Sequence, residues 1–266
     1  MLPRLLRYLS SFAPLTAVEE LHRAADQRVL RFSAREDLLI PGEVSRYLLL
    51  SLDGIACRHS LLANGRHQIT ALLLPGDILG FEALAGWRCV DTVTALTSMH
   101  CLRISATIAQ RFIESGAMLG LLLRGIAELQ QAIGREWIVN VGTRLARDRA
   151  AHFFCEMMRR ARALGLCSGN SCPLPLNQIE LADVTALTAV HVNRVLADLK
   201  ATTGTSLHKG VLHVPDPAAL ESLIQYDPRY LHPLADGDDL NQAEDPIAVT
   251  GSSGWTLMAA FEQSAR

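Results

Sequence analysis

The chain has 266 residues, of which 49% are hydrophobic, and a formal net charge of −2. Its length predicts a substantial buried core and about two domains. Because the charge is almost balanced, a generally basic coat for nucleic acid is excluded, and any contact with nucleic acid must be local. The six cysteines form no C-x-x-C pair and no zinc spacing, so we expect reduced thiols and no bound metal.

The N-terminal stretch MLPRLLRYLSSF contains leucines that are interrupted by Arg4 and Arg7. It therefore lacks the apolar run of a signal peptide, and no other stretch approaches the ~20 apolar residues of a membrane span. We expect a cytoplasmic protein with no membrane partner. Between residues 15 and 26, apolar side chains at helical spacing predict a short helix.

Residues 29 to 103 consist of short runs of branched residues, broken by turn signals every ~10 residues. Asn64-Gly65 lies between two apolar-alternating runs, which is the strongest short-range signal for a hairpin. Such spacing predicts an antiparallel sandwich or jelly roll. The other turn signals are Pro41-Gly42, Asp53-Gly54, Pro75-Gly76-Asp77 and Gly86.

After Ser105 the pattern becomes helical, and five apolar residues form a heptad seam. A second apolar face on the same helix could pack against the strands, which leaves the seam to meet a twin helix. Beta-branched residues and Gly142 predict a break at residues 137–142, and another helix should follow from Thr143 to about Ala163. The seam residues are Leu119, Leu122, Ile126, Leu129 and Ile133.

The composition of residues 165–175 predicts a loop. Cys167 and Cys172 lie close together in it, and we interpret them as loop and packing cysteines, with a redox pair as the alternative. An arginine-rich run beside this loop either contributes to a nucleic-acid contact or forms a solvated helix face. Its members are Arg144, Arg147, Arg149, Arg159, Arg160 and Arg162.

Residues 177–200 predict two helices joined by a tight turn. Thr188 has the hydroxyl that an N-cap needs, and a second helix should run from it to about residue 204. Four apolar residues of this helix fall on one stripe, and the opposite face is free to contact a partner. The stripe contains Val192, Val195, Leu196 and Leu199, and the free face contains Val190, His191, Asn193, Arg194, Ala197 and Asp198.

Two short strands, at residues 206–208 and 211–214, should form a wing, and a last helix should begin at Pro215-Asp216-Pro217. From about residue 231 to 266 the chain is acidic and has little periodicity, so we expect a disordered tail.

Two segments together resemble the CRP/FNR superfamily of bacterial transcription regulators. NQIELADVTALTAVHVNRVLADLK is similar to the family's helix-turn-helix, and YLLLSLDGIACRHSLLANGRHQITALLLPGDILG is similar to its cyclic-nucleotide-binding-like β-roll. The implied fold class is α+β. The resemblance implies a sensor at residues 1–104, a dimerisation helix at 105–139, a winged helix-turn-helix at 140–230 and a hinge near 138–143.

The resemblance also implies a homodimer that joins through the seam listed above, binds a palindromic operator in double-stranded DNA, and contacts or blocks RNA polymerase. Arg194 is the expected base reader, because its planar fork can donate two hydrogen bonds to guanine. The candidate DNA-binding residues are Thr188, Ala189, Val190, His191, Asn193, Arg194, His208 and Lys209.

Relatives that bind a cyclic nucleotide hold its phosphate with a Gly-Glu pair and then an Arg-Ser pair. Phe81 occupies the acid position here, Asp91 would oppose a phosphate, and we therefore expect no cyclic-nucleotide cofactor. We also expect no iron–sulfur cluster, because no cysteine precedes Cys57. The candidate effector pocket consists of Gly80, Phe81, Glu82, Arg88, Cys89 and Val90.

Two other functions stay open at this point. The chain could be a ligand-binding protein whose C-terminal domain mediates protein contacts instead of DNA contacts. A jelly-roll enzyme would need a tight cluster of histidine and glutamate, whereas His59, His67 and His100 are scattered. We therefore expect a regulator and not an enzyme.

Overall fold

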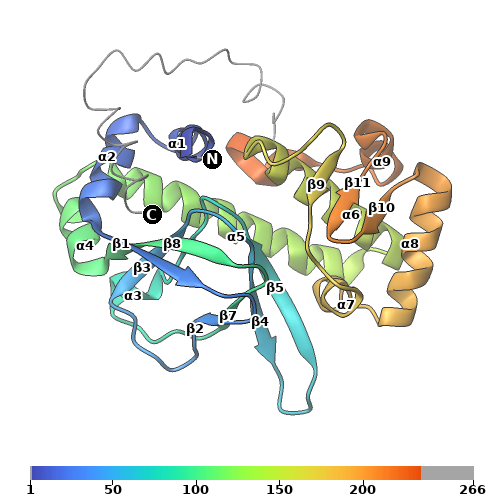
Figure 1. Ribbon diagram of the computed structural model, residues 1–266, viewed down its shortest axis with the longest axis horizontal. Helices are drawn as coiled ribbons and strands as arrows, with labels where there is room; N and C mark the ends of the chain where they lie inside the picture. The colour runs from blue at the N-terminus through green and yellow to red at the C-terminus, as the bar shows by residue number, and fades with distance from the viewer. Residues whose placement is uncertain (1, 235–266) are drawn as a thin grey trace. The chain divides into compact units, whose positions relative to one another are not determined.

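The computed structural model describes residues 2–234, which form two compact units (Figure 1). The first unit contains residues 2–58 and 72–128, and the second contains residues 59–71 and 129–234. Residues 231–234 of the expected tail belong to a 3-10 helix, η1 (Pro228–Leu234), and the rest of that tail lies outside the described residues. Among the described residues, no helix is both long enough and apolar enough to cross a membrane.

The first unit begins with two helices, α1 (Leu2–Ser10) and α2 (Leu15–Ala24). The sequence predicted α2. It did not predict α1, although Leu5, Leu6 and Leu9 are buried on one side of that helix. Arg4 lies among these leucines in the sequence, and a helix separates such residues onto different faces because its period is ~3.6 residues.

Eight strands form two antiparallel sheets, in the orders β1-β8-β3-β6 and β2-β7-β4-β5. The central strand β3 pairs with β8, for example Leu49 with Arg103. This arrangement confirms the predicted β-roll. The strands are β1 (Ala25–Phe32), β2 (Asp37–Leu39), β3 (Tyr47–Ser51), β4 (Ala56–Leu61), β5 (His67–Leu73), β6 (Ile78–Leu79), β7 (Thr92–Ala95) and β8 (Met99–Ser105).

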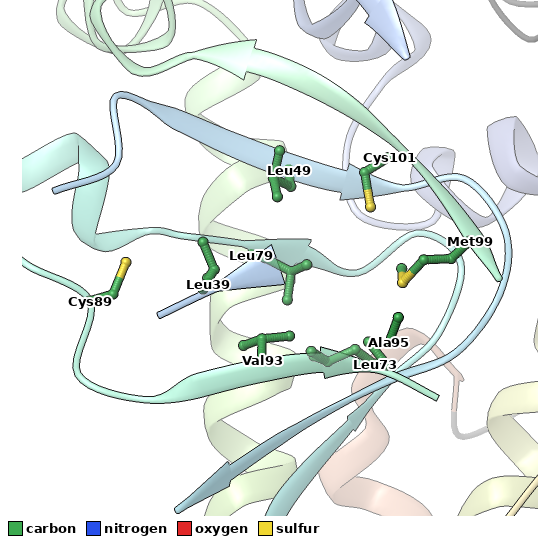
Figure 2. Close-up of a cluster of buried hydrophobic side chains, with 10 residues drawn as sticks. Leu39, Leu49, Leu73, Leu79, Cys89, Val93, Ala95, Met99 and Cys101 are labelled. Carbon is green, nitrogen blue, oxygen red and sulfur yellow. The ribbon is translucent and has the colours of Figure 1, made fainter. Parts of the chain in front are cut away.

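The interior of the roll is apolar. Figure 2 shows side chains from both sheets, such as Leu49 and Val93, pointing into one shared core. Leu48 and Leu50 point to the other face of β3 and are also fully buried, because α2 and α4 (Ala106–Glu114) pack on that sheet. The core cluster consists of Leu39, Leu49, Ala56, Leu73, Leu79, Cys89, Val93, Ala95, Met99 and Cys101.

One predicted turn has a strict requirement for glycine. Gly54 has φ +75°, and a Cβ atom there would lie 2.3 Å from the Cβ atom of Met99. Both the backbone conformation and the space exclude a larger residue. The predicted Asp53-Gly54 turn therefore also sets how closely β8 approaches the end of β3.

The long helix α5 (Leu119–Thr143) differs from the prediction at both ends. The chain breaks at Gly116, with φ +74°, so α4 and α5 are separate helices. Residues 138–143, which were expected to form a hinge, are the last turns of α5. Beta-branched residues cost a helix only about 0.7 kcal/mol or less each, so the packing of the rest of α5 outweighs that preference.

The seam on α5 is buried within one chain, which corrects the predicted dimer interface. Its five residues are at most 4% exposed, so they have no free surface for a second copy. An apolar repeat shows that a helix face is buried, but not whether the partner is the same chain or another. The corrected residues are Leu119, Leu122, Ile126, Leu129 and Ile133.

Residues 146–223 of the second unit form a winged helix-turn-helix. The first helix of this motif, α6 (Ala146–Ala163), buries Phe153 and Phe154 and packs on the two helices that follow, α7 (Gln178–Thr185) and α8 (Ala189–Thr203). A small sheet has the order β10-β11-β9, and α9 closes the domain. The remaining bounds are β9 (Ser171–Pro173), β10 (Ser206–His208), β11 (Val211–His213) and α9 (Pro217–Leu223).

Candidate nucleic-acid interface

The first helix of the motif, α7, begins at a reciprocal capping box. Asn177 Oδ1 accepts hydrogen bonds from the backbone N–H groups of Ile179 and Glu180, both at 2.9 Å. Glu180 Oε2 in turn accepts from the Asn177 N–H at 2.8 Å. These bonds satisfy backbone donors that the helix leaves free at its start, so the start of α7 is well defined.

A left-handed residue joins α7 to α8. Ala186 has φ +51° and ψ +43°, a conformation that is unfavourable for a residue with a Cβ atom. Arg149 of α6 holds this turn, since its Nη1 donates to the Thr185 oxygen at 2.9 Å and to the Ala186 oxygen at 3.3 Å. The angle between the two helices is thus supported from a third element.

Thr188 is the N-cap of α8, as predicted. Its Oγ1 accepts a hydrogen bond from the His191 N–H at 3.3 Å. The side chain is exposed beside the helix N-terminus, where the partial positive charge of the helix favours an anion such as a phosphate. The cap therefore starts the helix and leaves this N-terminus accessible from outside the domain.

Helix α8 has one buried and one exposed face, as its periodicity predicted. Val192, Val195 and Leu199 are at most 7% exposed and attach the helix to the domain. Val190 is 63% exposed. The structure brings the predicted reading residues together on the outer face of the first turns: Val190, His191, Asn193 and Arg194 are exposed, and Ala189 is half-buried beside them.

The exposed side chains of α8 include Arg194 near its start, and Asp198 and Lys200 further on. Asp198 Oδ2 lies 4.0 Å from Arg147 Nε, which is itself hydrogen-bonded to Asp148 at 3.2 Å. Among residues 2–234, Arg194 has no salt-bridge partner within 4.0 Å. Its guanidinium is available for bidentate hydrogen bonds to an acceptor outside the chain.

The wing is a tight hairpin whose tip carries His208 and Lys209. Lys209 and Gly210 both have positive φ, +48° and +75°, as a two-residue type I′ turn requires. Both predicted phosphate contacts are exposed there. A groove of about 550 Å³ separates the wing from the helices and is lined by Pro175, Gln178, Leu181, Leu196, Leu207 and Lys209 among others.

The arginine-rich run does not supply a free basic surface. Arg159 binds Glu221 through two hydrogen bonds of 2.7 and 2.8 Å, Arg144 lies 2.6 Å from Glu136, and Arg149 holds the turn described above. Arg160 pairs with Glu156 inside the domain. These side chains therefore stabilise the domain, and of the two interpretations that the run allowed, the contact with nucleic acid is not supported.

Sequence reasoning missed a buried polar network that supports the reading helices. Glu156 is fully buried and accepts hydrogen bonds from Trp137 Nε1 at 2.9 Å and from Tyr230 Oη at 3.0 Å. Arg160 Nη1 lies 3.2 Å from the other carboxylate oxygen. The spacing of Glu156 and Arg160, one helical turn apart, was the only local signal of this pair.

His152 lies one turn before Glu156 and is also buried. Its ring stacks on Tyr230 with centroids 5.8 Å apart, and its Nε2 lies 3.1 Å from Glu136 Oε1 without the alignment of a hydrogen bond. Burial, and secondarily the nearby Arg144, lowers the pKa of His152 to about 3. Burial raises the pKa of Glu156, against the opposing effect of Arg160. The imidazole is therefore neutral at pH 7.

The candidate effector residues of the roll differ in their surroundings. Arg88 Nη1 donates to the Gly42 oxygen at 2.6 Å, so this guanidinium group is hydrogen-bonded within the roll. Cys89 belongs to the apolar core cluster (Figure 2), whereas Val90 is 72% exposed. Phe81 lines a different, mainly apolar groove of about 520 Å³ with residues of α4 and α5. Gly80 and Glu82 flank Phe81 at the start of α3 (Glu82–Ala85).

Histidines of the roll are engaged by neighbouring side chains. His100 Nδ1 lies 2.8 Å from Asp53 Oδ2, and the rings of His59 and His67 lie 4.5 Å apart. Within the described part of the chain, no three His, Cys, Asp or Glu side chains are grouped so that they could hold a metal ion.

Two family models match the chain. The Crp-like helix-turn-helix domain matches residues 148–223, and the cyclic nucleotide-binding domain matches residues 29–116. The first match covers α6 to α9, which includes every element of the interface described above. The second covers the roll.

Similar curated proteins are regulators. The chain is 28% identical over 196 residues to the nitrogen fixation regulation protein FixK of Bradyrhizobium diazoefficiens, a match that covers 74% of this chain and 81% of FixK. It is 29% identical over 188 residues to the transcriptional activator protein FnrL of Cereibacter sphaeroides, which covers 69% and 74% of the two chains.

Solved structures have the same fold. FixK2 from Bradyrhizobium japonicum superposes with a TM-score of 0.66 at 21% identity, over 73% of this chain and 96% of that one. A CRP-family transcriptional regulator from Thermus thermophilus, TTHB099, superposes with a TM-score of 0.59 at 25% identity, over 74% and 96%.

Proposed function

The chain belongs to the CRP/FNR superfamily of DNA-binding transcription regulators, and we propose that it binds a palindromic operator as a homodimer through the outer face of α8. One observation carries this proposal. Val190, His191 and Arg194 are exposed together on the first turns of a helix that Thr188 caps and that Val192, Val195 and Leu199 attach to the domain. We expect the protein to act in the cytoplasm, where bacterial DNA lies.

Each exposed side chain has a role that follows from its chemistry. Arg194 would donate two hydrogen bonds to guanine O6 and N7, Val190 would contact a thymine methyl group, and His191 would reach a base edge or a phosphate. Thr188, His208 and Lys209 would contact the phosphate backbone and set the position of the protein without selecting sequence.

We propose that the dimer forms through the exposed stripe of α5. Leu121 is 40% exposed and Val139 is 45% exposed, and at ~100° per residue these two positions lie on the same side of the helix. Glu128 and Arg135 are exposed between them. A twofold axis along this stripe would present two copies of α8 to half-sites ~34 Å apart.

Replacing Leu121 and Val139 by aspartate tests this interface. We expect the double variant to sediment as a monomer at a concentration at which the natural protein is a dimer. Dimerisation would bury the two aspartates of each protomer in an apolar interface without a partner, which is unfavourable. Leu61→Asp is the matched control, since Leu61 is 68% exposed on β4 and lies off α5. A double variant that stays dimeric would place the interface elsewhere.

DNA selection from a random library, at fixed moderate salt, tests the function itself. We expect Arg194→Ala to lose about 1–3 kcal/mol of discrimination between the selected operator and unrelated DNA, because the bidentate guanine contact is gone. Lys200→Ala, which removes the same charge from the far end of α8, should keep that discrimination.

Salt dependence separates the DNA-binding function from the alternative, a C-terminal domain that contacts proteins. Binding through phosphates must weaken steeply as salt rises. If selection enriches no sequence and binding is insensitive to salt, the protein-contact function is favoured instead. Contact with RNA polymerase, or its exclusion from a promoter, would be the output of operator binding.

We propose that the roll binds no cyclic nucleotide. Arg88, which lies next to the expected Arg-Ser position in the sequence, is bonded to the Gly42 oxygen, and the core cluster of the roll is apolar. Titration calorimetry with cyclic AMP and cyclic GMP should therefore show no heat of binding. Saturable binding of either nucleotide would contradict this proposal.

A further inference from the structure

A tight hairpin lies between α6 and α7, inside the stretch that the sequence predicted only as a loop. Ser168 and Ser171 exchange both backbone hydrogen bonds, with N–O distances of 2.9 and 3.1 Å. Gly169, with φ +58°, and Asn170 form the two-residue turn between them. Ser168 and Ser171 are therefore a hydrogen-bonded antiparallel pair.

This register brings Cys167 and Cys172 opposite each other. They flank the hydrogen-bonded pair, so they occupy a non-hydrogen-bonded position, where Cα atoms lie ~4.5 Å apart and side chains approach most closely. That separation is within the range that disulfides span. In agreement with this position, each of the two cysteines shifts the pKa of the other.

The two cysteines differ in access and in acidity. Cys172 is 2% exposed, whereas Cys167 is half-buried, with its Sγ 3.8 Å from the Sδ of Met158. The hydrogen bond from Cys172, and to a lesser degree Arg162, lowers the pKa of Cys167, and the same bond raises the pKa of Cys172. Cys167 thus has the character of an attacking thiolate and Cys172 that of a resolving thiol.

We propose that Cys167 and Cys172 form a dithiol site that hydroperoxides oxidise to a disulfide. The Cys167 sulfur attacks one peroxide oxygen, the O–O bond breaks, and the other oxygen leaves as water, so that Cys167 becomes a sulfenic acid. The Cys172 sulfur then attacks the Cys167 sulfur and displaces the sulfenic oxygen as a second water. Two thiols and one hydrogen peroxide give one disulfide and two waters, and an added dithiol reverses the change.

The site lies at the end of the small sheet that is remote from the wing turn. Ser171 pairs with His213 and Cys172 with Leu212, whereas Pro173 pairs with Val211, next to the turn at Lys209. Asn170 further ties the hairpin to the domain, because its Nδ2 donates to the Pro215 oxygen at 2.7 Å. A disulfide would fasten the segment after α6 to β9, and its formation does not depend on DNA binding.

Mass spectrometry of the full chain tests the proposal directly. The reduced protein is treated with hydrogen peroxide at neutral pH, the peroxide is removed, and the remaining thiols are alkylated after the protein has been denatured. We expect two of the six cysteines to escape alkylation, and the tryptic peptide of residues 163–194, which contains only Cys167 and Cys172, to be lighter by two hydrogens. Dithiothreitol should restore both thiols, and the oxidised protein should unfold at a higher temperature than the reduced protein.

Three variants make the outcome decisive. Cys172→Ala should stop at a sulfenic acid on Cys167 that dimedone traps, and Cys167→Ala should leave Cys172 alkylatable. Cys89→Ala removes a thiol that is 4% exposed and should leave the reaction unchanged. Overoxidation of Cys167 without a disulfide in the natural chain, or a disulfide that involves another cysteine, would overturn the proposal.

Discussion

The interior of the β-roll is apolar, whereas the centre of the second unit holds a buried carboxylate, Glu156, and a buried guanidinium, Arg160. Dispersion and the hydrophobic effect stabilise the roll, and these interactions are non-directional and insensitive to pH. The polar centre depends on geometry and on protonation, because a buried charge is tolerated only while its partners are in place. Mutation should therefore destabilise the polar centre more than the roll, and only the polar centre should lose stability in acid.

The largest expected effect comes from Glu156→Ala. The change removes the carboxylate that pairs with the buried Arg160 and that accepts from Trp137 and Tyr230. We expect a loss of about 3–5 kcal/mol in the free energy of unfolding of the second unit, measured by urea denaturation. The double variant Glu156→Leu, Arg160→Leu should recover much of this loss. If it does not, the loss comes from altered side-chain packing around these two residues and not from an unpaired buried charge.

Acid should destabilise the second unit through His152. The pKa of His152 is about 3 in the folded protein and 6.5 in the unfolded chain, so between these two pH values only the unfolded chain binds a proton at this residue. Stability is then full above pH 6.5 and falls as pH decreases, by up to about 1.4 kcal/mol per pH unit. The pKa of Glu156 is raised, so its contribution to stability changes with pH in the opposite direction. Because both the natural chain and His152→Phe contain Glu156, comparing them isolates the effect of His152.

Urea denaturation at a series of pH values checks this prediction. His152→Phe keeps the stacking on Tyr230 and should flatten the acid side of the stability profile. The charged and titratable groups that face His152 are Glu136, Arg144, Tyr226 and Tyr230, and all are retained in the variant. An unchanged slope would mean that His152 is protonated in the folded protein.

The smallest effect is expected in the roll. Met99→Leu nearly conserves volume in a cluster without a charged member, so we expect a loss of no more than about 1.5 kcal/mol and no dependence on pH. The measurement is urea denaturation followed in parallel with the His152 series. A pH-dependent loss here would remove the contrast between the two regions.

The same contrast explains what could be predicted from the sequence. The stripe of Val192, Val195 and Leu199 repeats at helical spacing, and the hairpin signal Asn64-Gly65 lies between the neighbouring strands β4 and β5, so local pattern alone identified both. The N-cap Thr188 is equally local. These features lie within short stretches of the chain, and each was confirmed.

The rest depends on pairs of residues far apart in the chain. Periodicity marked the α5 seam as buried but could not say that the same chain buries it. The arginines of α6 gave a basic run, whereas their partners, Glu221 for Arg159 and the turn carbonyls for Arg149, lie many residues away. The polar centre likewise joins Trp137 to Glu156 and Tyr230, and no local pattern predicts that meeting.

The left-handed Ala186 has a further consequence. A glycine in its place would relieve the backbone, yet it would also widen the range of angles between α7 and α8 that Arg149 now restricts. The turn would then have less backbone strain, but the angle between α7 and α8 would be less well defined. At this one position, thermal stability and accurate recognition need not improve together, because the strained backbone of Ala186 also fixes the orientation of α8.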